Sequence, residues 1–190
     1  MKTLNELYPG IGVDTQIKAI KINSKEVNEG DLFVCTKGVT ADRHDFIDDA
    51  IKNGASAIIV SRDGFYDKGV PVIKVPDTNR ELPYLCQKFY DYPDNKLKMI
   101  GVTGTDGKTS TTTIIQTLIG SDLCGYIGTN GRSCAGFTGD NPNTTPDAQL
   151  LYSYLDEFVN YGCHYASIEA SSEAFFRGRL QAMQFDVSGY

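Results

Sequence analysis

The segment at positions 101–113 constrains the fold of this chain more than any other part of the sequence. It reads GVTGTDGKTSTTT, so an apolar run ends at Thr103, a glycine-rich turn follows, and Lys108 and Thr109 begin a helical pattern. Glycines in such a turn allow backbone N–H groups to point at phosphate oxygens, and the first turn of the helix adds partial positive charge. The segment therefore predicts a buried strand, a phosphate loop and a helix in direct succession.

Two side chains of this segment are suited to phosphate chemistry. Lys108 would bridge the β- and γ-phosphates of a nucleotide, and the hydroxyl of Thr109 would bind Mg²⁺. The segment departs from the common pattern G-x-x-x-x-G-K-[ST], because Val102 stands where the first glycine is required. A glycine-rich turn with an incidental lysine is the alternative, but the complete order of strand, turn and helix favours phosphate binding.

A carboxylate is expected beside this loop. Glu169 directly follows the apolar run 165–168, which has the composition of a buried strand. Because ligand sites in parallel sheets lie at the carboxyl ends of the strands, we expect Glu169 to meet the loop at 104–109 and to hold Mg²⁺ opposite Thr109. The alternative is that Glu169 is a solvated N-cap of a helix over 171–176.

The whole chain alternates strand and helix patterns, which predicts an α/β fold with parallel sheets joined by right-handed crossovers. The polar segment 91–96 contains a proline and interrupts the alternation. We therefore place a domain boundary there and expect a small N-terminal domain at 1–95 and a P-loop-type nucleotide-binding domain at 96–190. In the first domain, strands are expected at 17–22, 31–36, 57–61 and 70–75, and helices at 44–53 and after the N-cap Asp77. In the second, strands are expected at 98–103, 126–129, 165–168 and 185–190, and helices at 108–119 and 146–161.

The second domain is expected to be cut short. The stretch at 96–190 is shorter than the roughly 150 residues that a three-layer nucleotide-binding domain usually needs, and an apolar strand opens at its end. We therefore expect this chain to be a fragment of a longer protein or to pair with a missing part.

Charge and cysteine content exclude several classes of protein. The 190 residues include 18 Lys and Arg against 24 Asp and Glu, a net charge of −6, which argues against a nucleic-acid binder. No apolar run is long enough for a signal peptide or a membrane span, so a cytoplasmic protein is expected. The two histidines, His44 and His164, have no neighbours at metal-ligand spacing and are poor candidates for a catalytic base; His164, at the start of a strand, is interpreted as structural. The cysteines lack C-x-x-C spacing and are expected to be reduced thiols; they lie at 35, 86, 124, 134 and 163.

Two polar segments of the second domain are less specific. The loop at 141–147 reads NPNTTPD, which is typical of a turn with Thr145 as a helix N-cap and Pro146 at the first helical position. Arg177 and Arg179 could clamp a phosphate or a carboxylate, or could be solvated. The residues alone leave both interpretations of the arginines open.

Taken together, these segments resemble the Mur ligase family, and most closely its MurE type. The family's glycine loop reads G-T-N-G-K-T, and the loop at 104–109 matches it with Asp106 in place of Asn. NTTP at 143–146 is similar to the family's substrate loop, and IEASSEAFFRGRL at 168–180 is similar to its E-V-S-S-H-A-L…R segment. INSKEVNEGDLFVCTKGVTADRHDF at 22–46 resembles its uridine-nucleotide-binding region, D-S-R-x-V-x-x-G-D-L-F-V-A…G-x-x-x-D-G-H-x-F. Four separate motifs thus match in order.

The resemblance implies an ATP-dependent amide ligase. MurE-type ligases add the third amino acid to UDP-N-acetylmuramoyl-L-alanyl-D-glutamate in peptidoglycan precursor synthesis, through an acyl phosphate, with ATP and Mg²⁺. The resemblance further implies a cytoplasmic monomer with no nucleic-acid or membrane partner, whose substrates are this UDP-muramoyl dipeptide and an amino acid. It places the domain that selects the amino acid, diaminopimelate or lysine, beyond Tyr190.

The family's functional residues carry over to matching positions of this sequence. The resemblance implies that Lys108 is the catalytic residue. It implies that ATP is bound by seven consecutive residues: Gly104, Thr105, Asp106, Gly107, Lys108, Thr109 and Ser110. Contacts with Mg²⁺ fall on Thr109 and Glu169. The resemblance implies that the uridine diphosphate end of the substrate is bound by Ile22, Ser24, Val39, Thr40 and Ala41. It implies that the muramoyl-peptide end is bound by Asn143, Thr144, Thr145, Ser171, Arg177 and Arg179.

Three positions depart from the family's pattern. Arg43 stands where the family has Gly, Glu173 where it often has His, and Arg177 where a Gln can occur. These changes leave the phosphate loop intact but keep open a paralogous Mur-type ligase with a related substrate. Two competing hypotheses are a non-catalytic uridine-nucleotide-binding module and an unrelated P-loop kinase. A kinase needs no preceding α/β domain of this kind, and a binding module needs no Lys108–Thr109 pair.

Overall fold

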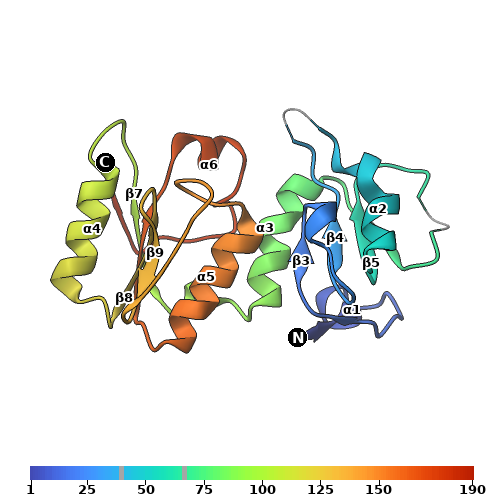
Figure 1. The fold of residues 1–190 in the computed structure, drawn as a ribbon, viewed down its shortest axis with the longest axis horizontal. Helices are drawn as coiled ribbons and strands as arrows, with labels where there is room; N and C mark the ends of the chain where they lie inside the picture. Colours follow the sequence, from blue (N-terminus) through green and yellow to red (C-terminus); the bar gives the residue numbers. More distant parts are fainter. Residues whose placement is uncertain (39–40, 66–67) are drawn as a thin grey trace. The chain divides into compact units, whose positions relative to one another are not determined.

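Runs of β-branched residues alternate with amphipathic helices along the chain, and the computed structural model folds them into two α/β units (Figure 1). The structure describes residues 1–38, 41–65 and 68–190. Unit 1 comprises Met1–Phe89 and unit 2 comprises Tyr90–Tyr190, each with its own sheet in which four strands run parallel. The α/β class with parallel sheets, which the sequence predicts, is confirmed.

The main sheet of unit 1 is parallel throughout, with the strand order β3-β4-β5-β6. The strands are β3 Ile20–Lys21, β4 Leu32–Val34, β5 Ala57–Val60 and β6 Val72–Lys74. Every residue of β4 and β5 is buried, as expected for strands covered on both faces. Figure 1 shows α2 (Ile47–Lys52) and α3 (Thr78–Phe89) on opposite sides of this sheet. Phe33 and Ile58 pack in one apolar cluster with Ile47 of α2.

The single strand expected at 17–22 is wrong, because the chain changes sheets within that segment. β2 (Gln16–Ile17) pairs antiparallel with β1 (Lys2–Thr3), whereas β3 joins the main sheet. Between β2 and β3, the N–H of Lys18 donates a hydrogen bond to the carbonyl of Gly30 at 2.9 Å. The short elements that the sequence analysis missed in this unit are β1, α1 (Leu4–Leu7) and η1 (Ser24–Glu26).

The two longer helices of unit 1 start differently. The helix expected at 44–53 begins with a 3-10 turn, η2 (Arg43–Phe46), before α2 follows. The expected N-cap of α3 is confirmed, since Oδ1 of Asp77 accepts a hydrogen bond from the N–H of Asn79 at 2.9 Å.

The sheet of unit 2 has the order β10-β9-β8-β11-β7-β12. Its strands are β7 Lys98–Val102, β8 Cys124–Gly128, β9 Gly131–Cys134, β10 Phe137–Gly139, β11 Tyr165–Glu169 and β12 Val187–Gly189. β8, β11, β7 and β12 run parallel. Their carboxyl ends therefore meet at one edge of the sheet, where ligand sites of such sheets lie.

Helices cover both faces of this sheet. Figure 1 shows α4 (Lys108–Ile119) and α5 (Ala148–Asn160) on opposite sides of it. α4 has the bounds that the sequence predicts, whereas α5 starts later than Pro146. A Cβ atom on Gly125 of β8 would overlap the ring of Phe158, so this glycine lets α5 pack closely on the strand. The shorter helices of the unit are η3 (Pro93–Asn95) and α6 (Ser172–Phe176).

The strands β9 and β10 extend the parallel sheet as antiparallel hairpins, which the sequence analysis did not predict. Ala135 and Gly136 join them with φ angles of 47° and 80°. Positive φ at both central residues is typical of the type I′ turn, whose twist suits a two-residue hairpin. Arg132 of β9 lies 4.1 Å from the ring centroid of Tyr154 and 3.0 Å from a carboxylate oxygen of Glu157. The hairpin is thus fixed to α5.

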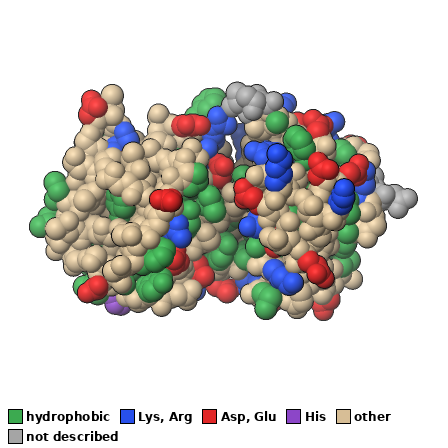
Figure 2. All heavy atoms as spheres, in the orientation of Figure 1, with side chains coloured by type: hydrophobic (Ala, Val, Ile, Leu, Met, Phe, Trp, Pro, Cys, Tyr) green, Lys and Arg blue, Asp and Glu red, His purple; other side chains and the backbone are tan. Residues whose placement is uncertain are grey.

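Three further observations concern the chain as a whole. Each of the five cysteines is a buried free thiol. Within the described ranges, no helix is both long and apolar enough to cross a membrane. On the face shown in Figure 2, the acidic and basic side chains of unit 1 are interspersed and do not gather by sign.

Candidate functional site

The predicted order of strand, glycine-rich turn and helix is present at the carboxyl end of β7. In the loop at 104–109, here called the glycine loop, Gly104 and Gly107 have φ angles of +126° and +78°, which other residues rarely adopt. Nζ of Lys108 donates hydrogen bonds to the carbonyls of Gly104 at 2.7 Å and of Thr105 at 3.3 Å. The ammonium group therefore lies across the glycine loop at the start of α4.

Glu169 ends β11, and the strand register places it beside Val102 of β7. It is fully buried, so the alternative of a solvated helix cap is wrong; Ser171 is the N-cap of α6. Oε2 of Glu169 accepts a hydrogen bond from the hydroxyl of Thr109 at 2.9 Å. The structure thus brings the carboxylate and the glycine loop together, as expected from the strand ends.

Three more hydrogen bonds hold the carboxylate of Glu169. Oε1 accepts from the hydroxyl of Tyr126 at 2.7 Å and from the N–H of Thr129 at 3.0 Å, and Oε2 accepts from the hydroxyl of Thr129 at 3.1 Å. Burial, reinforced by the bond to Glu169, raises the pKa of the Tyr126 phenol above its ordinary value, so the phenol remains a donor. Tyr126 and Thr129 are not among the residues predicted from the sequence, because the order β8-β11-β7 alone places the end of β8 beside Glu169.

The loop at 143–146, the expected substrate loop, begins close to this carboxylate. The hydroxyl of Thr144 lies 3.0 Å from the hydroxyl of Thr129, which itself donates to Glu169. Asn143 is exposed. The loop therefore offers two polar groups. Asn143 has an exposed amide, and the hydroxyl of Thr144 is linked to the carboxylate of Glu169 through the hydroxyl of Thr129.

Thr145 anchors this loop from inside. It is fully buried, and its hydroxyl donates to the carbonyl of Glu169 and accepts from the N–H of Ser171 at 3.0 Å. The predicted role of Thr145 as a helix N-cap is therefore wrong, because its hydroxyl is taken by the segment that follows β11. Asp147 occupies the N-cap position of α5, without a side-chain capping bond.

Both candidate arginines pair with carboxylates of this chain. Nε of Arg177 donates to Oε1 of Glu173 at 2.7 Å. Nε of Arg179 lies 2.7 Å from Oδ1 of Asp147, and its Nη1 donates to the carbonyl of Thr145 at 2.8 Å. The side chain of Arg179 is only 11% exposed, so it is not simply solvated. Arg179 holds the loop at 143–146 against the start of α5.

In unit 1, five residues are expected to meet a uridine nucleotide. The described ones are Ile22, Ser24 and Ala41, while Val39 and Thr40 lie outside the described residues. Ile22 and Ser24 are buried, and the carbonyl of Ser24 accepts a hydrogen bond from Nδ2 of Asn53 at 2.9 Å. The carbonyl of Ala41 accepts from the N–H of Gly38 at 2.9 Å. The assignment of these residues to a uridine nucleotide stays a prediction.

His44 is a buried residue whose ring nitrogens both have partners. Nδ1 lies 2.5 Å from Oδ1 of Asp42, and Nε2 accepts a hydrogen bond from the N–H of Ser61 at 3.0 Å. Nη1 of Arg62 donates to the other oxygen of Asp42 at 3.0 Å. Burial alone raises the pKa of Asp42, but the hydrogen bonds from His44 and Arg62 outweigh it and lower the pKa to about 2. These bonds indicate a structural role for His44, whereas the side chain of His164, which the sequence suggests is structural, is exposed.

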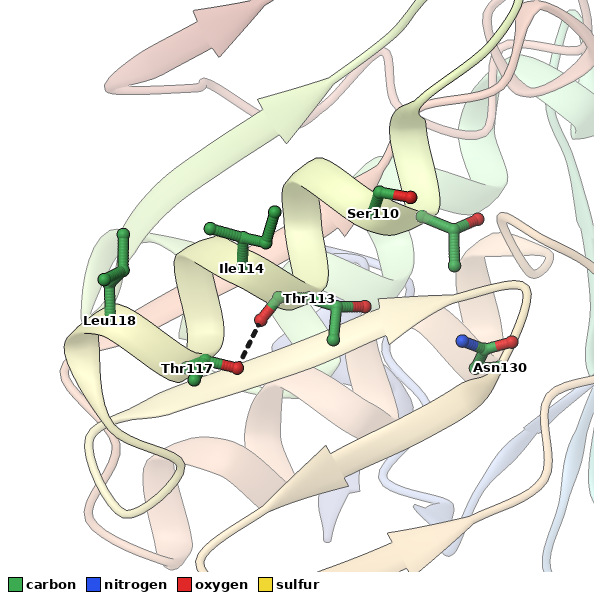
Figure 3. Close-up of a pocket in the computed structure, with 7 residues that line it drawn as sticks. Ser110, Thr113, Ile114, Thr117, Leu118 and Asn130 are labelled. Carbon is green, nitrogen blue, oxygen red and sulfur yellow. Dashed lines mark hydrogen bonds between the residues drawn. The ribbon is translucent and has the colours of Figure 1, made fainter.

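A cavity of about 400 Å³ begins at the glycine loop and continues along α4 (Figure 3). Thr109 and Ser110 line its start, and Ile114 and Leu118, which are 57% and 80% exposed, line its apolar side. Asn130 reaches it from the turn between β8 and β9. A cavity of this size suits a small organic molecule next to the glycine loop.

The oxygen atoms at Thr109 and Glu169 fit a magnesium ion. Hydroxyl and carboxylate oxygens are the ligands that this hard cation prefers. In the part of the chain that the structure describes, no group of three or more His, Cys, Asp or Glu side chains could hold a metal alone. A cation between Thr109 and Glu169 would have further ligands, which Mg²⁺ commonly takes from waters and phosphates.

The sequence of this chain matches the model of the Mur ligase family, catalytic domain, over residues 16–99, and that of the Mur ligase middle domain over residues 102–188. It is 37% identical over 194 residues to the UDP-N-acetylmuramoyl-L-alanyl-D-glutamate–2,6-diaminopimelate ligase of Geobacillus thermodenitrificans, covering 99% of this chain and 39% of that protein. It is 39% identical over 175 residues to the protein of the same name from Bacillus cereus, covering 91% of this chain and 35% of that protein.

Solved structures agree with the sequence matches. A structure of a UDP-N-acetylmuramoyl-L-alanyl-D-glutamate–2,6-diaminopimelate ligase superposes with a TM-score of 0.77 at 27% identity, over 99% of this chain and 40% of that one. The MurF ligase of Thermotoga maritima in complex with ADP gives a TM-score of 0.57 at 30% identity, over 83% of this chain and 32% of that one. The chain spans about two fifths of the length of the curated relative from Geobacillus thermodenitrificans.

Proposed function

Because the chain belongs to the Mur ligase family, we propose that it forms the uridine-nucleotide-binding and ATP-binding part of a MurE-type amide ligase. The relatives are named as ligases of UDP-N-acetylmuramoyl-L-alanyl-D-glutamate and 2,6-diaminopimelate. The observation that carries the proposal is the hydrogen bond between Thr109 and Glu169, because it joins a glycine loop suited to phosphates to a carboxylate suited to a cation.

In the proposed reaction, the substrate carboxylate attacks the γ-phosphorus of ATP, the bond from that phosphorus to ADP breaks, and an acyl phosphate forms. The incoming amine then attacks the acyl carbon, loses a proton, and displaces inorganic phosphate to leave an amide. Lys108 would exchange the carbonyls of Gly104 and Thr105 for phosphate oxygens and neutralise charge on the transferring phosphoryl group. The backbone N–H groups of the glycine loop would hold the nucleotide phosphates.

Thr109 and Glu169 would hold Mg²⁺ together with phosphate oxygens of the nucleotide. When bound, the ion supplies positive charge against the developing negative charge of the phosphoryl group. The cavity along α4 begins at Thr109 and Ser110, which supports binding of the rest of the nucleotide there.

The UDP-muramoyl dipeptide would be held at its two ends. Unit 1 would bind the uridine diphosphate through the segment around Ser24 and Ala41. Asn143 and Thr144 would meet the muramoyl-peptide end, whereas Thr145, Ser171 and Arg179 would support that loop from inside, since their polar groups are bonded within the chain. The proposal includes a cytoplasmic monomer, as expected from the sequence.

The test is a ligation assay on the protein of the complete reading frame, since the relatives are longer than this chain. The protein is incubated with ATP, Mg²⁺, UDP-N-acetylmuramoyl-L-alanyl-D-glutamate and either diaminopimelate or lysine, and the tripeptide product is sought by mass spectrometry. We expect tripeptide and equimolar ADP with one of the two amino acids. Phosphorylation of another acceptor without amide formation would favour a kinase. Uridine diphosphate binding without ADP release would favour a non-catalytic module, and ligation of a different UDP substrate would favour a paralogous ligase.

A further inference from the structure

Tyr126 is a polar residue inside unit 2 that neither binds the nucleotide nor reaches the substrate loop in the function proposed above. It is 4% exposed. Its hydroxyl donates to Oε1 of Glu169 at 2.7 Å and accepts a hydrogen bond from the N–H of Asn130 at 3.3 Å. Because Asn130 supplies a proton to the phenol oxygen, the single hydroxyl proton of Tyr126 is directed at Glu169.

The two oxygens of Glu169 have donors of different kinds. Oε1 accepts from the buried phenol of Tyr126 and from the backbone N–H of Thr129, and neither donor can turn away without moving a ring or the main chain. Oε2 accepts from the hydroxyls of Thr109 and Thr129, whose protons rotate freely. A cation can therefore replace the donors at Oε2 at little cost, whereas Oε1 stays occupied.

Gly128 provides the space for this arrangement. A Cβ atom there would overlap both Oε1 of Glu169 and the hydroxyl oxygen of Tyr126. Gly128 ends β8 and pairs across the turn with Gly131, so its main chain cannot move aside without disturbing the hairpin. The Tyr126 hydroxyl and the Glu169 carboxylate thus meet in space that is open only because residue 128 is a glycine.

We propose that Tyr126 is a positioning residue, which holds Oε1 of Glu169 so that Oε2 alone faces the divalent cation at the glycine loop. This inference rests on the proposed function, because it requires a cation between Thr109 and Glu169. Without the phenol, only the N–H of Thr129 still holds Oε1, so the carboxylate is less firmly oriented for the cation. Tyr126 would then affect the affinity for the metal and leave the metal-free affinity for the nucleotide unchanged.

The test uses the 190-residue chain with Mn²⁺ as a spectroscopic probe in place of Mg²⁺. Mn²⁺ affinity is measured by electron paramagnetic resonance in the presence of ADP, and ADP affinity is measured by calorimetry in EDTA. Tyr126→Phe should weaken Mn²⁺ binding by roughly 10-fold or more, the usual effect of losing a partner of a metal ligand. Its metal-free ADP affinity should stay within about 2-fold of the wild type.

A matched control is available in unit 1. The hydroxyl of Tyr8 donates to Oε1 of Glu81 at 2.8 Å, so Tyr8→Phe removes the same kind of bond far from the glycine loop in sequence. This variant should change neither affinity. Gly128→Ala keeps the phenol but crowds the same two oxygens, and it should lower the Mn²⁺ affinity as Tyr126→Phe does. Because the new Cβ also overlaps Oε1 of Glu169 itself, this variant tests the fixed position of that oxygen, and Tyr126→Phe tests the phenol.

The outcomes are distinguishable. Wild-type Mn²⁺ affinity in a folded Tyr126→Phe protein would overturn the inference alone, and so would an equal loss of ADP affinity in EDTA, which indicates a general structural role. A wild-type chain that binds no ADP, with or without Mn²⁺, would overturn the proposed nucleotide site and the inference with it.

Discussion

Both units place a buried polar side chain at the carboxyl end of a parallel strand, but the two side chains have different kinds of partners. In unit 1, the N–H of Ser61 after β5 donates to His44, whose other nitrogen is held by Asp42. In unit 2, Glu169 at the end of β11 accepts from two threonine hydroxyls as well as from a phenol and a backbone N–H.

The difference separates a structural polar group from one suited to a ligand. His44 has one partner for each nitrogen, so a ligand could bind only by breaking a bond that stabilises the fold. The hydroxyls on Oε2 of Glu169 can rotate to new acceptors, so a cation can enter without leaving a buried group unpaired. Exchangeable donors, more than burial itself, distinguish the carboxylate that we propose holds the cation.

The largest expected effect tests the assignment of catalysis to unit 2. In the protein of the complete reading frame, Lys108→Ala should lower the rate of ADP release by roughly 10²–10⁵-fold, because it removes a charge from the transferring phosphoryl group. Lys96→Ala is the control, since this exposed lysine precedes β7 at the end opposite the glycine loop. A steady-state rate within tenfold of the wild type would remove Lys108 from the mechanism.

A smaller effect tests the structural role of His44. His44→Ala should lower the free energy of unfolding of unit 1 by about 1–3 kcal/mol, because the N–H of Ser61 and the carboxylate of Asp42 lose a buried partner. ADP affinity should not change. His164→Ala, the exposed histidine of unit 2, should stay within about 0.5 kcal/mol of the wild type in chemical denaturation. If His44→Ala abolished ADP binding in a folded chain, the contrast between the units would fail.

A third prediction asks whether unit 1 has a ligand of its own. Ser24→Ala should weaken uridine diphosphate binding by about 5-fold, the equivalent of one hydrogen bond of about 1 kcal/mol. The titration is done by calorimetry with ADP saturating, so that the glycine loop is occupied. Ser153→Ala, a serine within α5, is the control. Equal heats for uridine and adenosine diphosphates at this second site would contradict a uridine-specific unit 1.

The smallest expected effect is the pH dependence of the stability of unit 1, which tests the hydrogen bonds of Asp42 with His44 and Arg62. The pKa of Asp42 is lowered from 3.8 to about 2, so this carboxylate stabilises unit 1 fully above about pH 4 and loses that contribution as the pH falls towards 2. Urea unfolding at several values between pH 4 and 2 should show a steeper loss in the wild type than in Asp42→Asn. Parallel slopes for the two proteins would show that the network does not perturb Asp42.

The sequence predicted the parts of the fold and site that depend on local pattern. The strand, turn and helix around Lys108 and the strand leading to Glu169 follow from apolar runs and glycines, and their meeting follows from the rule that parallel strands end at one edge. The hairpin of β9 and β10 was missed, because its strands are short and partly polar and Ala-Gly is a weaker turn pattern than Asn-Gly. The hairpin of β8 and β9 was missed although Asn130-Gly131 lies at its turn.

The remaining part of the site depends on strand order, which a single sequence does not reveal. Tyr126 and Thr129 lie more than 35 residues before Glu169, and nothing local to them indicates that β8 is its neighbour. Thr145 shows the opposite error, since a pattern typical of a helix cap is overridden by a tertiary hydrogen bond to the segment after β11.

The position of β7 within its sheet has a consequence for how the chain is made. β7 lies between β11 and β12, so neither neighbour is available until residues 165–169 and 187–189 have been synthesised, whereas the four main strands of unit 1 all lie within residues 20–74. Ribosomes add roughly 5–20 residues per second. For several seconds of each round of synthesis, the apolar strand that leads into the glycine loop therefore has both edges without their native partners, and an unpaired apolar strand is a site at which chains aggregate.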